Sequence, residues 1–355
     1  MSPQRKLISV CILAYNRAAM LPALLESVLA QNVTGLDWEC VIAEDNSPER
    51  AAIRKVVEDY QKRAPGRIRY HENPRTLGYD GNFRQVIALA QGQYVFMMGN
   101  DDLVADGALA AVADALARHG EIGAILRAYT FFRDDPTRPF QVNRYYAREC
   151  RFAAGEQAIL ACFRRLGALN GLVFHRDAAH AAATDRWDGT LWYQQWLAGN
   201  ILARMDAVYI PTVLAHMRRG HGTDIGNAES EKERFAPGRM ETVESQVKLV
   251  QGMFDVAQGV EDAQGIKIAQ AIRDDFARYS YHTLSYVAWM PRREFWRAYR
   301  AFGALGFDRS PWFHLWYWSL AILGAKRMDW LVQTARRAIG HTPNLTPGAR
   351  SSHQG

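Results

Sequence analysis

Short apolar runs alternate with amphipathic segments along the first hundred residues. The amphipathic segments repeat their apolar positions at helical spacing, over about 18–31, 50–63 and 82–91. The apolar runs suit strands that are covered on both faces, and they occupy 7–14, 38–43, 68–71 and 94–98. This alternation predicts an α/β fold, with a doubly wound, mostly parallel sheet, right-handed crossovers and helices on both faces.

The rest of the chain changes pattern twice. Helices are predicted over 106–119 and 154–166, and strands over 122–132, 140–146, 169–176 and 207–215. From about 239 to 339 the pattern is helical, with breaks near Gly259, Pro291 and Gly306. We therefore expect an α/β domain over 1–235, a helical region over 236–340 and a disordered tail over 341–355.

Composition and charge exclude few classes of protein or of binding partner. The 355 residues are 48% hydrophobic, enough for a large core. Four scattered cysteines lack metal-binding spacing, and no apolar signal segment opens the chain, so we expect reduced, mostly buried thiols in a cytoplasmic protein. A net charge of +6 and a pI near 9.1 are compatible with nucleic acid, anionic lipid or phosphate-rich small molecules.

Polar side chains follow each of the four predicted strands. They include Asn16 and Arg17, Glu44 and Asp45, Arg75, and the Asn100-Asp101-Asp102 triplet. Ligands of such sheets bind beyond the carboxyl ends of the strands, and adjacent carboxylates suit a hard divalent cation with a phosphate-bearing ligand. The alternative is that Asp101 and Asp102 only form a turn and cap the next helix. The chain has no GxGxxG after its first strand and no Walker A loop, which disfavours a dinucleotide or P-loop fold.

Four segments resemble the inverting family 2 glycosyltransferases of the GT-A fold. They keep the family's order and spacing within roughly the first 110 residues: 9–17 (SVCILAYNR), 41–47 (VIAEDNS), 73–82 and 92–102. The chain is similar in particular to bacterial enzymes that build O-antigen and other surface polysaccharides, including the abequosyltransferase-like group. The resemblance implies inverting transfer of a hexose or deoxyhexose from a nucleoside-diphosphate sugar to a saccharide acceptor carried on polyprenyl diphosphate. It also divides 1–235 into a nucleotide-sugar half, 1–110, and an acceptor half, 111–235.

The resemblance also implies roles for the residues at the strand ends. Asp102 would hold a divalent metal, Mn²⁺ or Mg²⁺, and Asn100 or Asp101 would face the ribose. The chain departs from the family at Glu44, where Asp is common, and at Asn100, where an acidic residue often stands. The residues expected around the nucleobase and diphosphate are Ala14, Tyr15, Arg17, Glu44, Asp45 and Arg75.

Inverting transfer needs a base that deprotonates the acceptor hydroxyl. Carboxylates just before the aromatic-rich helix expected from about Thr190 are candidates, with Asp188 as first choice and Asp185 as the alternate. Both could instead cap the helix that begins near Thr190. Trp187, Trp192 and Trp196 could stack on sugar faces, although their spacing is also that of a core stripe.

The segment 216–224 is basic and rich in glycine and histidine. Family members often close such a loop over the diphosphate, sometimes with a histidine on the metal. By resemblance His216 and His221 are candidate metal ligands, and Arg218 and Arg219 would neutralise phosphate charge. A solvated loop histidine is the alternative.

An apolar, aromatic stretch at 311–325 lies between two groups of basic residues. It is shorter than the ~20 residues of a spanning helix, but Trp and Tyr between basic flanks are typical of the membrane interface. We expect peripheral contact of 292–337 with an anionic leaflet, at the cytoplasmic face of the inner membrane; the alternative is a helix that covers the core. No nucleic-acid partner is expected, because these arginines are interleaved with apolar residues and no recognised motif is present.

Two other functions fit parts of the sequence. A nucleotidyltransferase acting on a sugar phosphate shares a nucleotide-binding sheet and an acidic metal site, but it ordinarily has a Gly-rich basic loop where this chain has Ala14 to Arg17. An inactive GT-A-like scaffold could bind nucleic acid or membrane through its basic surface.

Overall fold

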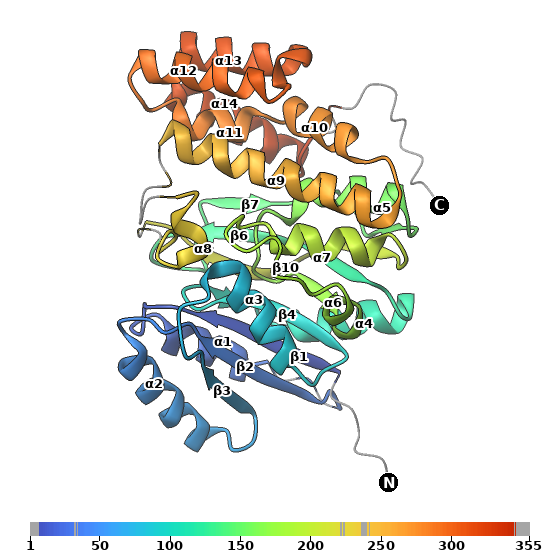
Figure 1. Cartoon of the computed structure of the whole chain (residues 1–355). Coiled ribbons are helices and arrows are strands. Elements are labelled where there is room, and N and C mark those ends of the chain that lie inside the picture. Colours follow the sequence, from blue (N-terminus) through green and yellow to red (C-terminus); the bar gives the residue numbers. More distant parts are fainter. Residues whose placement is uncertain are drawn as a thin grey trace.

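The computed structural model of the chain describes residues 7–31, 33, 35–220, 222, 224–235, 240, 242–343 and 345. The chain starts in a sheet sandwiched between helices and ends in a purely helical layer at the opposite end of the molecule (Figure 1). Residues 1–6, the candidate metal ligand His221 and most of the predicted tail lie outside the described residues.

Four parallel strands form the first half of the sheet, in the order β3-β2-β1-β4. They are β1 (Ile8–Ala14), β2 (Trp38–Glu44), β3 (Ile68–Glu72) and β4 (Tyr94–Gly99). The crossovers contain α1 (Leu21–Leu29), α2 (Arg50–Arg63) and α3 (Gly78–Leu89). Every residue of β1 and β2 is buried, which is why their sequences lack polar alternation. The predicted doubly wound α/β sheet is confirmed.

The sheet continues beyond β4 with strands of both directions, in the order β9-β6-β10-β5. These are β5 (Leu103–Val104), β6 (Ala124–Phe132), β9 (Val173–His175) and β10 (Ala207–Arg218). β9 is antiparallel to β4 and β6, whereas β10 runs parallel to β6. Two short strands, β7 (Gln141–Asn143) and β8 (Cys150–Phe152), pair with β6 and β10. The predicted strands over 140–146 and 169–176 are therefore present but shorter.

Helices cover both faces and build two cores. The elements of this part are α4 (Ala108–His119), α5 (Glu156–Cys162), the 3-10 turn η1 (Phe163–Leu166), α6 (Arg176–Ala181), α7 (Tyr193–Leu202) and α8 (Glu229–Lys232). One core lies under α1, α2 and α4. The other starts under α3 and α7 and continues into the C-terminal helices as far as Met328. The helical region thus shares a core with the sheet.

The C-terminal helices pack on the α/β domain through a close helix pair. They are α9 (Val243–Gln264), α10 (Ala269–Arg278), α11 (Tyr281–Val287), α12 (Arg292–Ala304), the turn η2 (Phe307–Arg309), α13 (Pro311–Leu323) and α14 (Ala325–Ile339). α7 and α9 approach closely because α7 carries a glycine at the contact, where a Cβ at Gly199 would lie 2.5 Å from Val260. Gly259 of α9 makes room in the same way for Trp187, which precedes α7, since a Cβ there would lie 2.1 Å from the indole. The predicted helical pattern after 239 is confirmed.

The aromatic helix α13 has two different faces. Phe313, Tyr317 and Leu320 are buried in the core, whereas Leu315, Trp318 and Ile322 are half or more exposed. Within the described part of the chain, no helix is long and apolar enough to cross a membrane. The four cysteines form no disulfide, and all but Cys150 are buried, as predicted.

Candidate active site

The carboxyl ends of β1, β2 and β4 meet at one edge of the sheet, because these strands are parallel neighbours. The end of β10 reaches the same place through its pairing with β5, in which His216 lies opposite Leu103. The candidate residues of the nucleotide-sugar half and those of the loop after β10 therefore come together, although more than a hundred residues separate them.

Asp101 and Asp102 lie at the centre of this edge. Asp102 is 5% exposed, and its carboxylate accepts hydrogen bonds from Asn170 Nδ2 at 2.6 Å and from the Arg218 backbone N–H at 2.5 Å. Burial raises the pKa of Asp102 well above its usual range, and the neighbouring charge of Asp101 raises it further. Asp101 forms an ion pair with Arg17 at 2.5 Å. The pair is more than a turn or helix cap, since its side chains are held by three separate segments.

Asn170 is a site residue that the sequence did not indicate. Besides donating to Asp102, it accepts the Gly99 backbone N–H through Oδ1 at 2.5 Å, and its own carbonyl accepts Nε of the buried Arg127 at 2.7 Å. It therefore fixes the end of β4 and the Asp102 carboxylate together. An asparagine before a glycine is an ordinary turn signal, so only the fold reveals this role.

The turn after β1 is strained and tied to the rest of the site. Asn16 and Arg17 adopt left-handed backbone conformations, with φ of 52° and 59°, which few non-glycine residues do. Asn100 Nδ2 donates to the Asn16 carbonyl at 2.7 Å, and Arg17 also pairs with Asp224 at 3.0 Å. The strained turn directs the Arg17 guanidinium towards the two aspartates.

Glu44 and Asp45 play different parts at the end of β2. Glu44 is fully buried and accepts hydrogen bonds from two backbone N–H groups of its own turn and from Arg50 Nε, so it holds the turn. Asp45 accepts the backbone N–H groups of Leu77 and Gly78, each at 2.8 Å. Burial raises the pKa of Asp45 to about 6 despite these bonds. Arg75 lies in the loop between β3 and α3, two residues before Leu77, and its side chain is exposed.

Three buried polar atoms near these strand ends have no hydrogen-bond partner among the described residues: Asn16 Oδ1, Ser47 Oγ and Asn73 Oδ1. Tyr15 is half-buried beside them, and burial together with the charges of Asp224 and Asp45 raises its pKa. Buried polar atoms without a partner are unfavourable. A polar ligand at this edge would supply the missing partners.

The end of β10 and the residue that follows it, Arg219, place basic side chains around the aspartates. His216 Nδ1 lies 2.8 Å from Thr130 Oγ1, and burial lowers the pKa of His216, so its ring is neutral near pH 7. Arg218 Nε approaches the Asp101 carbonyl at 3.3 Å, and its guanidinium lies 4.8 Å from the Phe132 ring. Arg219 stacks on Phe131 at 4.1 Å.

The proposed bases lie beside α3 rather than in the Asp101–Asp102 network. Both carboxylate oxygens of Asp188 are held by Arg84 of α3, at 2.6 and 2.8 Å. Asp185 is exposed, and neither aspartate caps α7. That cap is Asp80, another residue that the sequence did not indicate, which accepts the backbone N–H groups of Leu191 and Tyr193 at 2.8 and 3.0 Å.

The tryptophans of the same segment serve the core. Trp187 and Trp196 are buried with ring centroids 5.5 Å apart. Trp192 and Trp196 donate their indole N–H groups to the backbone carbonyls of Leu249 and Ala182, each at 2.7 Å. Of the two alternatives for this stripe, packing in the core is the one observed.

Comparison with known proteins agrees with this geometry. A sequence model described as "Glycosyl transferase family 2" matches residues 9–183, from β1 to just beyond α6. The chain carries a family 2 glycosyltransferase domain. Abequosyltransferase RfbV of Salmonella typhimurium is 33% identical over 116 residues, which cover 33% of this chain and 34% of that protein. The match thus spans about one third of the curated relative.

Two solved structures resemble nearly the whole chain in fold. TarS 1–349 of S. aureus in complex with UDP-GlcNAc has a TM-score of 0.51 at 12% identity, over 96% of this chain and 95% of that one. The mannosyltransferase PcManGT of Pyrobaculum calidifontis, in complex with GDP-Man and Mn²⁺, has a TM-score of 0.51 at 15% identity, over 92% and 87%. At these identities the likeness shows the fold, and it confirms the GT-A fold predicted from the sequence.

Proposed function

We propose that this protein transfers a sugar, with inversion, from a nucleoside diphosphate to a saccharide acceptor in the synthesis of a bacterial surface polysaccharide. The observation that carries the proposal is the Asp101–Asp102 pair, with Asp102 buried and Asp101 partly buried, held at the meeting point of β1, β4 and β10 between Arg17 and Arg218. The abequosyltransferase relative and the two neighbours bound to nucleotide sugars support this class of reaction.

The donor would lie across the carboxyl ends of β1, β2 and β4. Tyr15 and Asp45 would border the nucleobase. The unpartnered side-chain oxygens of Asn16 and Asn73 would accept hydrogen bonds from the ligand. Arg17, Arg218 and Arg219 bring positive charge to the diphosphate side of the aspartates. When the acceptor oxygen attacks the anomeric carbon and the bond to the diphosphate breaks, these guanidinium groups stabilise the charge on the leaving group.

Asp101 and Asp102 fit a divalent cation of the Mn²⁺ or Mg²⁺ type. Their repulsion and burial keep the pKa of Asp102 high, and a cation would relieve both. No further His, Cys, Asp or Glu completes a three-residue metal group in the described part of the chain. The remaining ligands would be diphosphate oxygens and water. His216 stays a candidate, because Thr130 engages Nδ1 and the neutral ring keeps Nε2 for a metal. A bound cation would neutralise charge on the departing diphosphate.

Asp188 stays our candidate for the base that deprotonates the acceptor hydroxyl. Its ion pair with Arg84 sets a condition, because both carboxylate oxygens are occupied by the guanidinium group and neither is free to receive the hydroxyl proton. Asp188 would have to exchange Arg84 for the acceptor hydroxyl when the acceptor binds.

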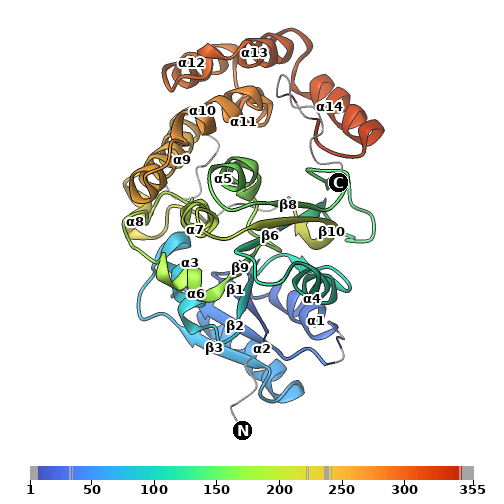
Figure 2. The same ribbon diagram turned by 90° about the vertical axis from the view of Figure 1, so that its right-hand side faces the viewer.

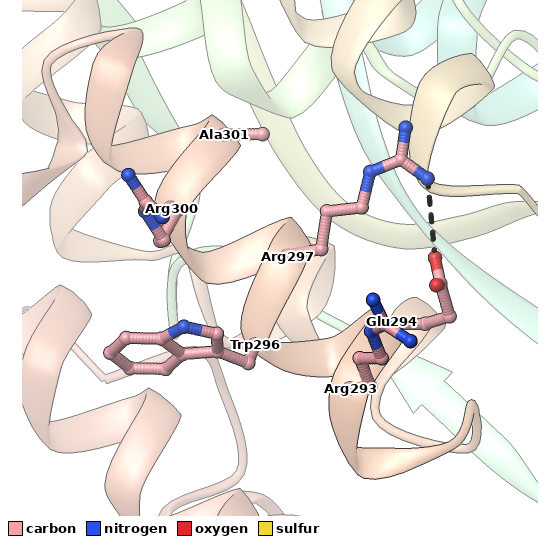
Figure 3. Close-up of a pocket in the computed structure, with 6 residues that line it drawn as sticks. All are labelled: Arg293, Glu294, Trp296, Arg297, Arg300 and Ala301. Atoms are coloured by element: carbon pink, nitrogen blue, oxygen red, sulfur yellow. Dashed lines mark hydrogen bonds and ion pairs between the residues drawn. The ribbon is translucent and has the colours of Figure 1, made fainter.

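The outer face of the C-terminal helices suits an anionic membrane surface, where a polyprenyl-linked acceptor would reside. α12 carries a shallow hollow of about 600 Å³ lined by Arg293, Arg297, Arg300 and Trp296 (Figure 3). Arg297 pairs with Glu244 at 2.5 Å, whereas neither Arg293 nor Arg300 forms an ion pair within the described residues. α13 packs on α12 through Tyr317, and its exposed face carries a stripe of apolar side chains.

Calorimetric titration of UDP, dTDP, GDP and CDP, each with and without Mn²⁺, tests the donor site. We expect one nucleotide to bind wild type only with metal, and Asp102→Ala to lose this binding while it keeps the wild-type circular dichroism spectrum. Metal-dependent binding that survives Asp102→Ala would remove the central claim.

A further inference from the structure

Arginines and tyrosines gather between the sheet and the C-terminal helices, next to the candidate active site. We call this group the arginine–tyrosine cluster, and its members are Arg127, Tyr129, Tyr145, Arg164, Arg165 and Tyr279. β6 supplies the first two, the segment after β7 the third, η1 the two adjacent arginines, and the end of α10 the last. In Figure 2, α10, α11 and α14 arch over the part of the sheet that contains β6 and β10.

Each arginine of the cluster lies over a tyrosine ring. The guanidinium carbon of Arg127 is 4.8 Å from the centroid of Tyr129, that of Arg164 is 3.6 Å from Tyr279, and that of Arg165 is 5.9 Å from Tyr145. The Tyr129 and Tyr145 hydroxyls are 3.4 Å apart, so the group is continuous. Stacking holds the guanidinium planes and leaves their edges for hydrogen bonds.

The edges of these guanidinium groups are incompletely used. One buried nitrogen of each arginine, Arg127 Nη1, Arg164 Nη2 and Arg165 Nε, has no acceptor among the residues that the structure describes. Arg127 is fully buried and reaches only backbone carbonyls, with no carboxylate in its hydrogen bonds. A buried cation that lacks a counter-charge is strongly unfavourable, so an anion is the group that this place lacks.

Positive charge also exceeds negative charge around the cluster. Asp275 pairs with Arg164 at 2.7 Å, and Asp329 is engaged by the Tyr281 hydroxyl. His282 lies where desolvation and three nearby guanidinium groups, those of Arg336, Arg219 and Arg164, lower its pKa to about 4. A neutral histidine adds no further charge, and the arginines keep a net excess.

The cluster is reachable and adjoins the catalytic edge. Tyr145 and Tyr279 are only half-buried, and Asn143 and Arg144, which precede Tyr145 in the chain, line a small hollow together with Arg336. Arg219 lies near both the cluster and the catalytic edge, because its positive charge lowers the pKa of both Asp102 and His282. A ligand bound here would thus extend from the helical layer towards the Asp101–Asp102 pair.

We propose that the arginine–tyrosine cluster binds a phosphate group of the saccharide acceptor, with guanidinium edges on phosphoryl oxygens and tyrosine rings against sugar faces. Phosphate suits the cluster because arginines at several angles can share its oxygens, and its charge offsets theirs. The proposal rests on the proposed function, since it names the chemistry of that reaction's acceptor. The phosphate could belong to a lipid carrier or to the glycan itself.

Isothermal titration of the full chain in EDTA tests the cluster with geranyl diphosphate, galactose 1-phosphate and galactose. The variants are Arg165→Gln within the cluster and Arg336→Gln at its rim, where a half-buried side chain makes misfolding a lesser concern. Arg118→Gln, on α4 and paired with Glu149, is the matched control. We expect at least one phosphate compound to bind, and each cluster variant to lose about tenfold in affinity while the control does not.

The preferred compound identifies the source of the phosphate, the lipid carrier for geranyl diphosphate and the glycan for galactose 1-phosphate. The proposal is overturned if neither phosphate compound binds, if galactose binds as tightly as its phosphate, or if the control loses as much as Arg336→Gln. Asp102→Ala should keep this binding while it loses metal-dependent nucleotide binding. Failure of the cluster and failure of the donor site are therefore separable.

Discussion

At the scale of single residues, the site depends on how Asp102 is held. Asn170 contacts both the Asp102 carboxylate and the Gly99 backbone N–H. A carboxylate that must meet a cation and a diphosphate benefits from one fixed orientation, and partners that fix ligands in this way strongly affect metal affinity. Asn170 is thus a positioning residue for the proposed metal.

Replacing Asn170 by alanine should weaken metal-dependent nucleotide binding by about 10- to 100-fold, because Asp102 would lose its side-chain donor. Calorimetry with and without Mn²⁺ measures the effect, and nucleotide affinity without metal should change little. Asn200→Ala is the control, since the hydrogen bonds of Asn200 to described residues lie within the helical layers, to Trp196 and Gln264. Equal affinity in Asn170→Ala and wild type would show that Asp102 needs no such support.

Variants of Asp188 and Arg84 can distinguish a catalytic role of Asp188 from a purely structural one. If Asp188 is the base, Asp188→Asn should lower turnover by about 10²- to 10⁴-fold with nucleotide binding intact, since that is the usual contribution of a general base. Arg84→Gln should then cost much less, because it frees the carboxylate. Turnover and thermal stability are measured for both variants and for the double variant. Equal, non-additive losses in both single variants would indicate an ion pair that only supports the fold.

At the scale of elements, the segment 184–193 is ordered by α3. Asp80 of α3 caps α7, and a Cβ at Gly189 would lie 2.0 Å from the Ser230 carbonyl oxygen, so this glycine allows the α8 segment to approach. Glu231 of α8 in turn accepts the Tyr79 backbone N–H at 2.7 Å. The start of α3 therefore joins the nucleotide half, the loop after β10 and the segment with the candidate base.

Burial raises the pKa of Asp80 to about 7, which predicts a pH dependence of stability. Between about pH 4 and pH 7 the folded chain keeps this proton and the unfolded chain loses it. The free energy of unfolding should therefore fall as pH rises through this window, by on the order of 2–4 kcal/mol from this group. Urea titrations of wild type and Asp80→Asn at several pH values measure it, and an equally steep slope in the variant would assign the dependence to other groups.

At the scale of the whole molecule, the helical layer extends the glycosyltransferase domain outward. It shares the core under α3 and α7, yet α11 to α14 leave several tryptophans exposed, including Trp289, Trp318 and Trp330. One face of α13 covers the core, which is the alternative to membrane contact, and its other face is exposed, so contact of that face with a membrane stays a prediction. α12 and α13 lie at the end of the molecule farthest from the N-terminus (Figure 1).

Binding to phosphatidylglycerol vesicles should depend on this outer face. The double variant Trp318→Glu, Ile322→Glu should lower vesicle binding at least tenfold, because it places two charges where apolar side chains would enter the interface. Arg300→Glu should weaken binding several-fold and Arg63→Glu on α2 should not, since about 1 kcal/mol per basic residue is lost only at the contacting surface. Flotation assays measure the bound fraction, and a full-length chain that ignores anionic vesicles would contradict the contact.

The sequence by itself determined the strands and crossovers of the first hundred residues and the order of their polar ends. Runs such as 7–14 and 94–98 are apolar throughout because both faces of a central strand are buried, and this signal is local. The shortened strands near 140 and 170, β7 and β9, were less predictable, because they form only where β6 and β4 offer partners.

Only the tertiary structure decided which of the polar residues share a site. Asn170, Asp80 and Arg84 look ordinary in the sequence, and their roles arise from contacts with residues 68 to 113 positions away. The arginine–tyrosine cluster likewise exists only where η1 and α10 meet β6. Local patterns specify elements, because they depend on neighbours along the chain, whereas a site depends on distances across the fold that those patterns do not contain.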